Sequence, residues 1–358
     1  MQSFNSHGYL DEKYDYLRKS LSGNYFRGEY KIYMNLYSFA RPIRLAIKEG
    51  KNNPLPDWGK TTNESINTFD AIKWAKEVGM EYIDPAFYFV PGYDDFAVPS
   101  EEEKVQIRKR VLELKKLVDE LGIKIISTGI KNDFCTSDIA RLKRDVERSK
   151  FYLEMSELLG AVMMRVFAGE IPDDIEKMGF EKVAEERLVK CIKELSDYCT
   201  DKRLKCMVGY QNHGDLLSTA NQVLYVADKL SNCPNVGLIN DTGHFRHFGS
   251  KEADGYPWYD DIARCLPVTV AFQLKTKPAG VGSKGPLTDL NLFFRHLRAS
   301  EYRAPISFEM LWRETDDDYP GKFPNPINEF KNQSLKFYNE VKAAELATRD
   351  MEPVNIKR

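Results

Sequence analysis

Four side chains that carry oxygen atoms recur at nearly equal intervals in the second half of the sequence. They are Gln211, Asp241, Gln273 and Glu309, spaced by 30, 32 and 36 residues. Each follows or ends a short run of β-branched and apolar residues, so each is expected at the end of a strand. Two are carboxylates, and carboxylate and amide oxygens suit hard divalent cations. The spacing therefore predicts a metal site where the four side chains converge.

Groups that can transfer protons lie beside these positions. His213 and His244 each follow a predicted strand end, and Lys275 comes two residues after Gln273. Together with Glu309 they are the predicted catalytic residues, because imidazole, amine and carboxylate groups are the usual general acids and bases. For each histidine the competing interpretation is a structural role, with the ring hydrogen-bonded inside the fold.

Four further residues are predicted to bind the substrate. Glu170 follows the fourth predicted strand, Arg246 follows His244 by two residues, and Trp312 and Arg313 follow the last predicted strand. The two arginines can orient a hydroxyl, carboxylate or phosphate group. The indole can pack against a sugar ring, with core packing as the competing interpretation.

The elements that must position these residues alternate regularly along the chain. Short apolar runs are each followed by a longer amphipathic stretch, which is typical of βα units around a parallel sheet. The predicted strands are Tyr30–Phe39, Tyr82–Phe89, Lys124–Ile130, Val162–Phe167, Lys205–Tyr210, Val236–Asn240, Thr269–Leu274 and Pro305–Met310. The predicted helices are Thr68–Val78, Glu101–Leu121, Ser137–Leu159, Phe180–Thr200, Leu216–Leu230, Trp258–Leu266, Leu287–Ala299 and Asn325–Leu346.

Eight strands alternating with helices predict the α/β class, as a single (β/α)₈ TIM barrel with a short N-terminal extension and a C-terminal helix. We expect the extension at residues 1–29, the barrel at 30–346 and a tail at 347–358. The proline-containing segment Arg41–Ile66 is expected to be a large first βα loop. No G-x-G-x-x-G fingerprint follows the first strand, which disfavours an open dinucleotide-binding sheet. In such barrels chemistry collects at the C-terminal ends of the strands.

Composition and charge limit the classes of function. The 358 residues include 52 Lys+Arg and 54 Asp+Glu, which gives a formal net charge of −2. Nucleic-acid binding usually needs a basic excess, so no nucleic-acid partner is expected. No apolar run of about 18 residues occurs, so no membrane partner is expected, and the first residues lack the apolar stretch of a signal peptide. The six cysteines form no C-x-x-C pair, which favours buried reduced thiols and a cytoplasmic location.

Several motifs resemble the sugar phosphate isomerase/epimerase family, within the xylose isomerase-like barrel superfamily. They are Gly209–Gly214 (GYQNHG), Val236–His244 (VGLINDTGH), Phe272–Lys275 (FQLK) and Ile306–Glu309 (ISFE), with support from Ala75–Asp84 and Met164–Gly169. The resemblance covers roughly residues 30–345. It implies the barrel fold, a small-molecule carbohydrate substrate, a divalent metal ion and, in many members, a homo-oligomer.

The family's usual metal ligands are Glu, Asp, His and Glu on strands five to eight, which fall here on Gln211, Asp241, Gln273 and Glu309. Two of the four match. The resemblance implies Mn²⁺ or Mg²⁺, with Co²⁺ or Zn²⁺ as alternatives, bound more weakly because glutamine is neutral. In the family's ketose epimerases two metal-bound glutamates act as opposed acid and base. Glutamine exchanges no proton at neutral pH, so Gln211 puts two-base epimerisation in doubt.

The expected function is a metal-assisted isomerase or epimerase that acts on a sugar, sugar phosphate or polyol by removing a proton next to a carbonyl. The alternative is a carbohydrate lyase, an inosose dehydratase-like or keto-sugar eliminase or hydratase, because a single base also suits loss of a β-hydroxyl. Two remote alternatives are an endonuclease IV-like nuclease and a non-catalytic sugar-binding relic.

Overall fold

The computed structural model describes residues 25–50, 57–214, 216–245, 257–276, 288–300, 302–310, 312 and 317–351. The strands are β1 (Ile32–Asn35), β2 (Tyr82–Asp84), β3 (Lys124–Ile125), β4 (Ser127–Gly129), β5 (Met163–Phe167), β6 (Met207–Gln211), β7 (Val236–Asp241), β8 (Thr269–Lys275) and β9 (Ile306–Glu309). The α-helices are α1 (Ala40–Gly50), α2 (Thr68–Glu77), α3 (Glu101–Leu121), α4 (Ile139–Leu159), α5 (Ile175–Met178), α6 (Phe180–Val183), α7 (Lys190–Lys202), α8 (Ala220–Lys229), α9 (Pro257–Cys265), α10 (Leu290–Arg298) and α11 (Pro326–Ala347).

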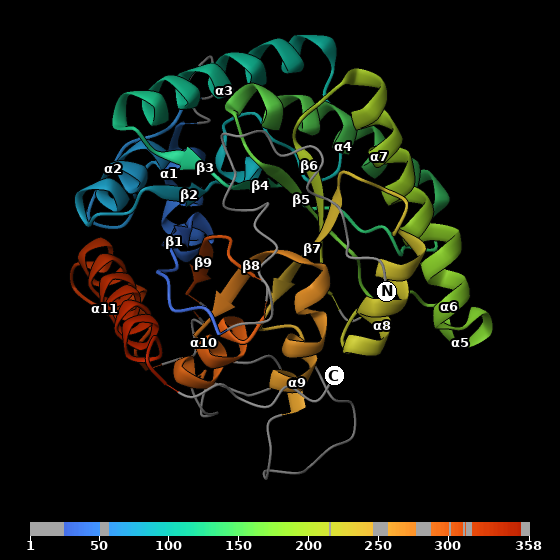
Figure 1. The fold of residues 1–358 in the computed structure, drawn as a ribbon. Coiled ribbons are helices and arrows are strands. Elements are labelled where there is room, and N and C mark those ends of the chain that lie inside the picture. Colours follow the sequence, from blue (N-terminus) through green and yellow to red (C-terminus); the bar gives the residue numbers. More distant parts are fainter. Residues whose placement is uncertain are drawn as a thin grey trace.

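The strands form one parallel sheet that closes into a barrel, with helices around it (Figure 1). The order is β3-β2-β1-β9-β8-β7-β6-β5-β4. β3 and β4 are two halves of one barrel strand, interrupted at Ile126. The Ile126 N–H donates to the carbonyl of Ile83 at 3.3 Å, and its own carbonyl accepts from the N–H of Met163 at 3.0 Å. This residue therefore joins the two ends of the sheet, and the predicted eight-stranded TIM barrel is confirmed.

Each of the eight predicted strands contains an observed strand, but the prediction of a loop over Arg41–Ile66 is partly wrong. Helix α1 covers Ala40–Gly50, and residues 51–56 lie outside the described part of the chain. Pro42 lies in the first turn of α1, where its missing N–H would have no partner within the helix. Ile43, Ala46 and Ile47 recur at helical spacing and are buried.

Three other predicted elements are shorter or divided. The first predicted strand ends at Asn35, and Leu36–Phe39 forms a 3₁₀ turn. The second predicted strand ends at Asp84, and Phe87–Phe89 forms a 3₁₀ turn. The predicted helix Phe180–Thr200 consists of α6, a π-helical segment at Ala184–Val189 and α7. The apolar spacing is similar in these helix types, so the pattern alone does not separate them.

The register of the strands determines which side chains meet inside the barrel. Asp241 of β7 pairs with Gln273 of β8, and Lys275 of β8 pairs with Glu309 of β9. Side chains alternate along a strand, so Gln273 and Lys275 point to the same face. Gln273 donates to Asp84 of β2, which is not a neighbour of β8 in the sheet, so the two polar side chains point to the barrel interior.

All six cysteines are buried and form no disulfide, as expected from their spacing. Burial raises the pKa of the Cys135 and Cys206 thiols well above the ordinary value, so both stay protonated at neutral pH. Among the described helices, none combines the length and apolar character needed to cross a membrane.

Candidate active site

The four predicted ligands meet at the C-terminal end of the barrel. The Gln211 amide nitrogen Nε2 donates to Asp241 Oδ2 at 2.5 Å and to Gln273 Oε1 at 2.6 Å. Glu309 joins the group through Lys275. The strand-end spacing thus places the four side chains as predicted, on four neighbouring strands.

Lys275, one of the predicted catalytic residues, lies between the two carboxylates. Its ammonium nitrogen Nζ donates to Glu309 Oε1 and lies 3.2 Å from Asp241 Oδ2. Asp241, Lys275 and Glu309 are called the buried triad below, since none is more than 5% exposed. Burial alone would lower the pKa of Lys275, but the two carboxylates outweigh it and raise this pKa, so the side chain is a cation.

A second set of polar side chains, which the strand-end pattern does not predict, lies in the first half of the barrel. Asp84 Oδ2 accepts from Asn35 Nδ2 at 3.2 Å and from Gln273 Nε2 at 3.3 Å. Arg165 donates from Nη1 to Gln211 Oε1 at 3.4 Å, and its Nη2 donates to the hydroxyl of Tyr88 at 2.9 Å.

A signal for two of these residues was present in the sequence. Asp84 and Arg165 are charged residues within predicted strands that are otherwise apolar. Gly129 of β4 pairs with Arg165 of the adjacent strand β5, and a Cβ atom at position 129 would lie 2.4 Å from Arg165 Nη2. The glycine therefore leaves room for the guanidinium group.

The charges of this site nearly balance. Lys275 and Arg165 carry two positive charges, and the carboxylates of Asp241 and Glu309 offset them. An ionised Asp84 would be a fifth buried charge. Burial raises the pKa of Asp84 from 3.8 to about 7, although a hydrogen bond from Ser127 and the nearby Arg165 guanidinium oppose this shift. Asp84 can therefore hold a proton near neutral pH.

This raised pKa predicts a pH-dependent stability. Between about pH 4 and pH 7 the folded chain keeps a proton on Asp84 that the unfolded chain has lost, so stability falls as pH rises through this window. Asp84→Asn removes this dependence. We expect the free energy of unfolding of the variant, relative to the wild type, to increase by up to about 4 kcal/mol from pH 4 to pH 8.

Urea unfolding at several pH values measures this difference, with Asp228→Asn on the exposed face of α8 as the control. A difference that does not change with pH would show that Asp84 is ionised throughout.

The two predicted catalytic histidines stack beside the buried triad. The rings of His213 and His244 have centroids 4.0 Å apart, and Phe167 lies 4.1 Å from His213. The Arg165 guanidinium lies 4.1 Å from the centroid of the Phe167 ring. These four groups are called the stacked wall below. Both histidines are partly exposed, whereas the triad is buried, and His244 Nε2 lies 3.9 Å from Asp241 Oδ2.

The predicted substrate-binding residues are less closely connected to the triad. Glu170 is exposed at the end of the loop after β5, with its backbone against Gly214. Trp312 donates from its indole N–H to the carbonyl of Ser38 at 2.8 Å and packs against Phe330. Arg246 and Arg313 lie outside the described residues. For all four, contact with a substrate stays a prediction.

The chemistry of the donors tests whether the site fits a divalent metal. Asp241 only accepts hydrogen bonds, so Gln211 must face it with its N–H group, and the Gln211 oxygen then faces Arg165. An ammonium group about 4 Å from a dication would repel it by about 8 kcal/mol at an effective dielectric constant of about 20. No cluster of three or more His, Cys, Asp or Glu with metal-binding geometry occurs in the described part of the chain. As arranged, these side chains do not fit a divalent ion.

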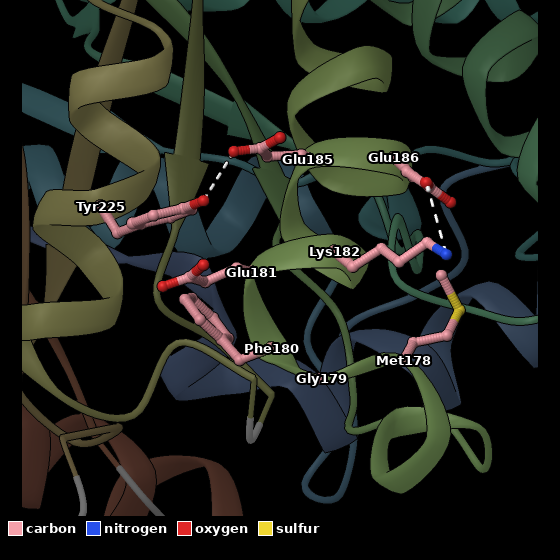
Figure 2. A pocket seen from close by; sticks show the side chains of 8 residues that line it. All are labelled: Met178, Gly179, Phe180, Glu181, Lys182, Glu185, Glu186 and Tyr225. Carbon is pink, nitrogen blue, oxygen red and sulfur yellow. Dashed lines mark hydrogen bonds and ion pairs between the residues drawn. The ribbon is translucent and has the colours of Figure 1, made fainter.

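A hollow elsewhere on the molecule offers no competing site. Figure 2 shows it on the helical layer, lined by residues of α5, α6, α8 and the π-helical segment. Two of its three acidic side chains have partners: Glu185 accepts from the Tyr225 hydroxyl and pairs with Lys229, and Glu186 pairs with Lys182. These pairs are typical of a solvated helix surface.

Comparison with known proteins supports the fold. The family model described as xylose isomerase-like TIM barrel matches residues 72–333. No curated protein matches the sequence. Among solved structures, the IolI protein with a bound zinc atom has a TM-score of 0.59 at 14% identity, covering 90% of this chain and 100% of that chain.

Two epimerases have similar structures. D-allulose 3-epimerase from Methylomonas sp. has a TM-score of 0.57 at 18% identity, covering 88% of this chain and 98% of that chain. The 3-keto-D-glucoside 4-epimerase of E. coli has a TM-score of 0.55 at 14% identity, covering 87% of this chain and 100% of that chain. At these identities the structures show a shared fold.

Proposed function

Because the chain belongs to the xylose isomerase-like TIM barrel family, we propose that it is an isomerase or epimerase of a small sugar, sugar phosphate or polyol derivative. The reaction moves a proton next to a carbonyl group. The observation that carries the proposal is the contact between Glu309 and the Lys275 ammonium at the C-terminal ends of adjacent strands. Two similar structures are sugar epimerases, which supports a sugar as the substrate class.

Glu309 and Lys275 together can catalyse the enolisation of a sugar carbonyl. Glu309 takes the proton from the carbon beside the carbonyl, and that C–H bond breaks as the carbonyl becomes an enediolate. Lys275 donates a hydrogen bond to the carbonyl oxygen, on which negative charge develops. The proton of the adjacent hydroxyl passes to the former carbonyl oxygen, and Glu309 returns its own proton to the former carbonyl carbon. A new carbonyl then stands on the carbon that lost the proton, which completes a 1,2-isomerisation.

One base is enough for this route. Gln211 stands at the position of the second base that the family resemblance implies, and an amide does not exchange protons at neutral pH. The one-base isomerisation is therefore favoured over two-base epimerisation. A lyase outcome would share the first step and differ in what leaves the enediolate.

The stacked wall is positioned to hold the sugar. Phe167, His213 and His244 of this wall are partly exposed, and His244 lies beside Asp241 of the buried triad. A sugar ring packed against these rings would lie close to the buried triad. The wall therefore supplies orientation, and the triad supplies the proton transfer.

His213→Ala tests this division of roles. We expect KM to increase about 3- to 10-fold with little change in kcat, because stacking contributes about 0.5–1.5 kcal/mol beyond area burial. Steady-state kinetics on the best substrate of the assay below measure both constants. A loss confined to kcat would instead assign His213 to proton transfer.

Proton exchange with solvent tests the proposed function itself. The protein is incubated in D₂O with a panel of ketopentoses, ketohexoses, their phosphates and inososes, and the products are followed by NMR. Isomerisation gives an aldose–ketose pair with deuterium next to the carbonyl, whereas elimination gives a product lighter by one water. Absence of both deuterium uptake and product for every sugar, with folded protein, would overturn the proposal.

A further inference from the structure

We propose that the ammonium group of Lys275 occupies the cation position of this site in place of a divalent metal ion, so that the site works without a metal. The inference deepens the proposed function and rests on it for the role of the cation. It stands on geometry: the Lys275 nitrogen contacts both carboxylates of the predicted ligand set.

The side chains predicted as metal ligands are joined by hydrogen bonds and ion pairs to one another and to neighbouring side chains. The chain runs from Asn35 through Asp84 and Gln273 to Gln211, and from there through Asp241 to Lys275 and Glu309. Each side-chain amide in it donates to at least one acceptor, and both carboxylates of the triad face Lys275. The side chains predicted as ligands therefore already have protein partners, and the amide nitrogen that Gln211 turns toward Asp241 has no free lone pair for a metal.

The neighbouring backbone leaves space for the lysine stem. A Cβ atom on Gly243 would lie 2.6 Å from Lys275 Cγ, so any larger residue there would displace the lysine. The Lys275 backbone is held as well, since its N–H donates to Thr242 Oγ1 at 2.9 Å and its carbonyl accepts from Thr288 Oγ1 at 2.7 Å. Lys275 is thus held by the close approach of Gly243 to its side-chain stem, by two hydrogen bonds to its backbone and by the two ion pairs of its ammonium group.

The test measures metal binding directly, without a sugar. The wild-type protein is expressed with added Mn²⁺, purified, and assayed for metal content and for Mn²⁺ binding by calorimetry. We expect well under one metal ion per chain and no Mn²⁺ binding below about 1 mM, because a dication would have to displace a paired ammonium. Stoichiometric metal in the purified protein, or micromolar Mn²⁺ binding that EDTA reverses, would overturn the inference.

Variants of Lys275 test whether its ammonium group is what excludes Mn²⁺. Lys275→Met leaves both carboxylates without their cation, so we expect its affinity for Mn²⁺ to increase at least about 100-fold and its melting temperature to rise on Mn²⁺ addition. Lys275→Arg keeps the charge and should bind no Mn²⁺. Lys336→Met, on the exposed face of α11, is the matched control and should behave as the wild type.

The metal-binding results and the sugar-turnover results can be told apart, so the inference about Lys275 and the proposed function can fail independently. If no sugar is turned over but the wild type excludes Mn²⁺ and Lys275→Met binds it, the proposed function fails and the lysine substitution stands. If Lys275→Met does not fold, the metal content and calorimetry of the wild type decide alone. If sugar turnover is observed and EDTA abolishes it together with bound metal, the proposed function stands and the inference fails.

Discussion

Glu309→Gln is expected to lower kcat/KM for sugar turnover by about 10³-fold, within the range for loss of a general base. Glutamine keeps the shape of the side chain and an oxygen that can accept from Lys275, but it cannot take a proton from carbon. Burial raises the pKa of Glu309, and the Lys275 ammonium opposes this, so the wild-type carboxylate remains a usable base.

The deuterium-exchange assay and steady-state kinetics measure this loss, and circular dichroism with thermal melting confirms that the barrel is folded. Glu340→Gln, on the exposed surface of α11, is the control and should keep the wild-type rate. Asp241→Asn should also lose turnover, since it removes a carboxylate that holds Lys275. Rates near that of the wild type in both site variants would refute the assignment of the site.

Lys275→Met is expected to lower the free energy of unfolding by about 3–5 kcal/mol at pH 8, because it leaves Asp241 and Glu309 as buried carboxylates without their cation. Burial raises the pKa of Glu309, and without the ammonium less would oppose this, so Glu309 would hold a proton more tightly in the folded chain than in the unfolded chain. The deficit should therefore shrink as pH falls toward 5, where protonation removes one of the buried charges.

Urea unfolding at pH 5 and pH 8, without added metal, measures both parts of this prediction. The double variant Lys275→Met/Glu309→Gln removes one uncompensated charge and should regain part of the lost stability, as a double-mutant cycle would show. A single variant as stable as the wild type at pH 8 would mean that the triad is not the ion pair network described above.

The barrel itself was predictable because its signal is repeated along the whole chain. Each strand is a short apolar run, and the last four strands, β6 to β9, each end at a polar residue that the barrel brings to the same rim. Helix α1 was missed because Pro42 reads as a loop residue unless it is recognised as part of a first helical turn.

The convergence of Gln211, Asp241, Gln273 and Glu309 was predictable from spacing, but the role of Lys275 between them was not. It depends on the register of β7 and β8, which shifts between Leu238 and Ile239 and sets Asp241 opposite Gln273. Such a shift leaves no mark in the sequence pattern. The direction in which each glutamine amide points depends in turn on the neighbours that this register supplies.

A cation that belongs to the chain cannot dissociate. Lys275 is synthesised with every copy of the protein, so the number of loaded sites equals the number of folded molecules, whatever the supply of metal in the surroundings. An ammonium group polarises a carbonyl less strongly than a divalent metal ion does. It carries one charge and donates hydrogen bonds, whereas the metal ion carries two charges and accepts lone pairs. A site of this kind suits carbonyl groups that need only modest polarisation, and starvation for metal would leave its capacity unchanged.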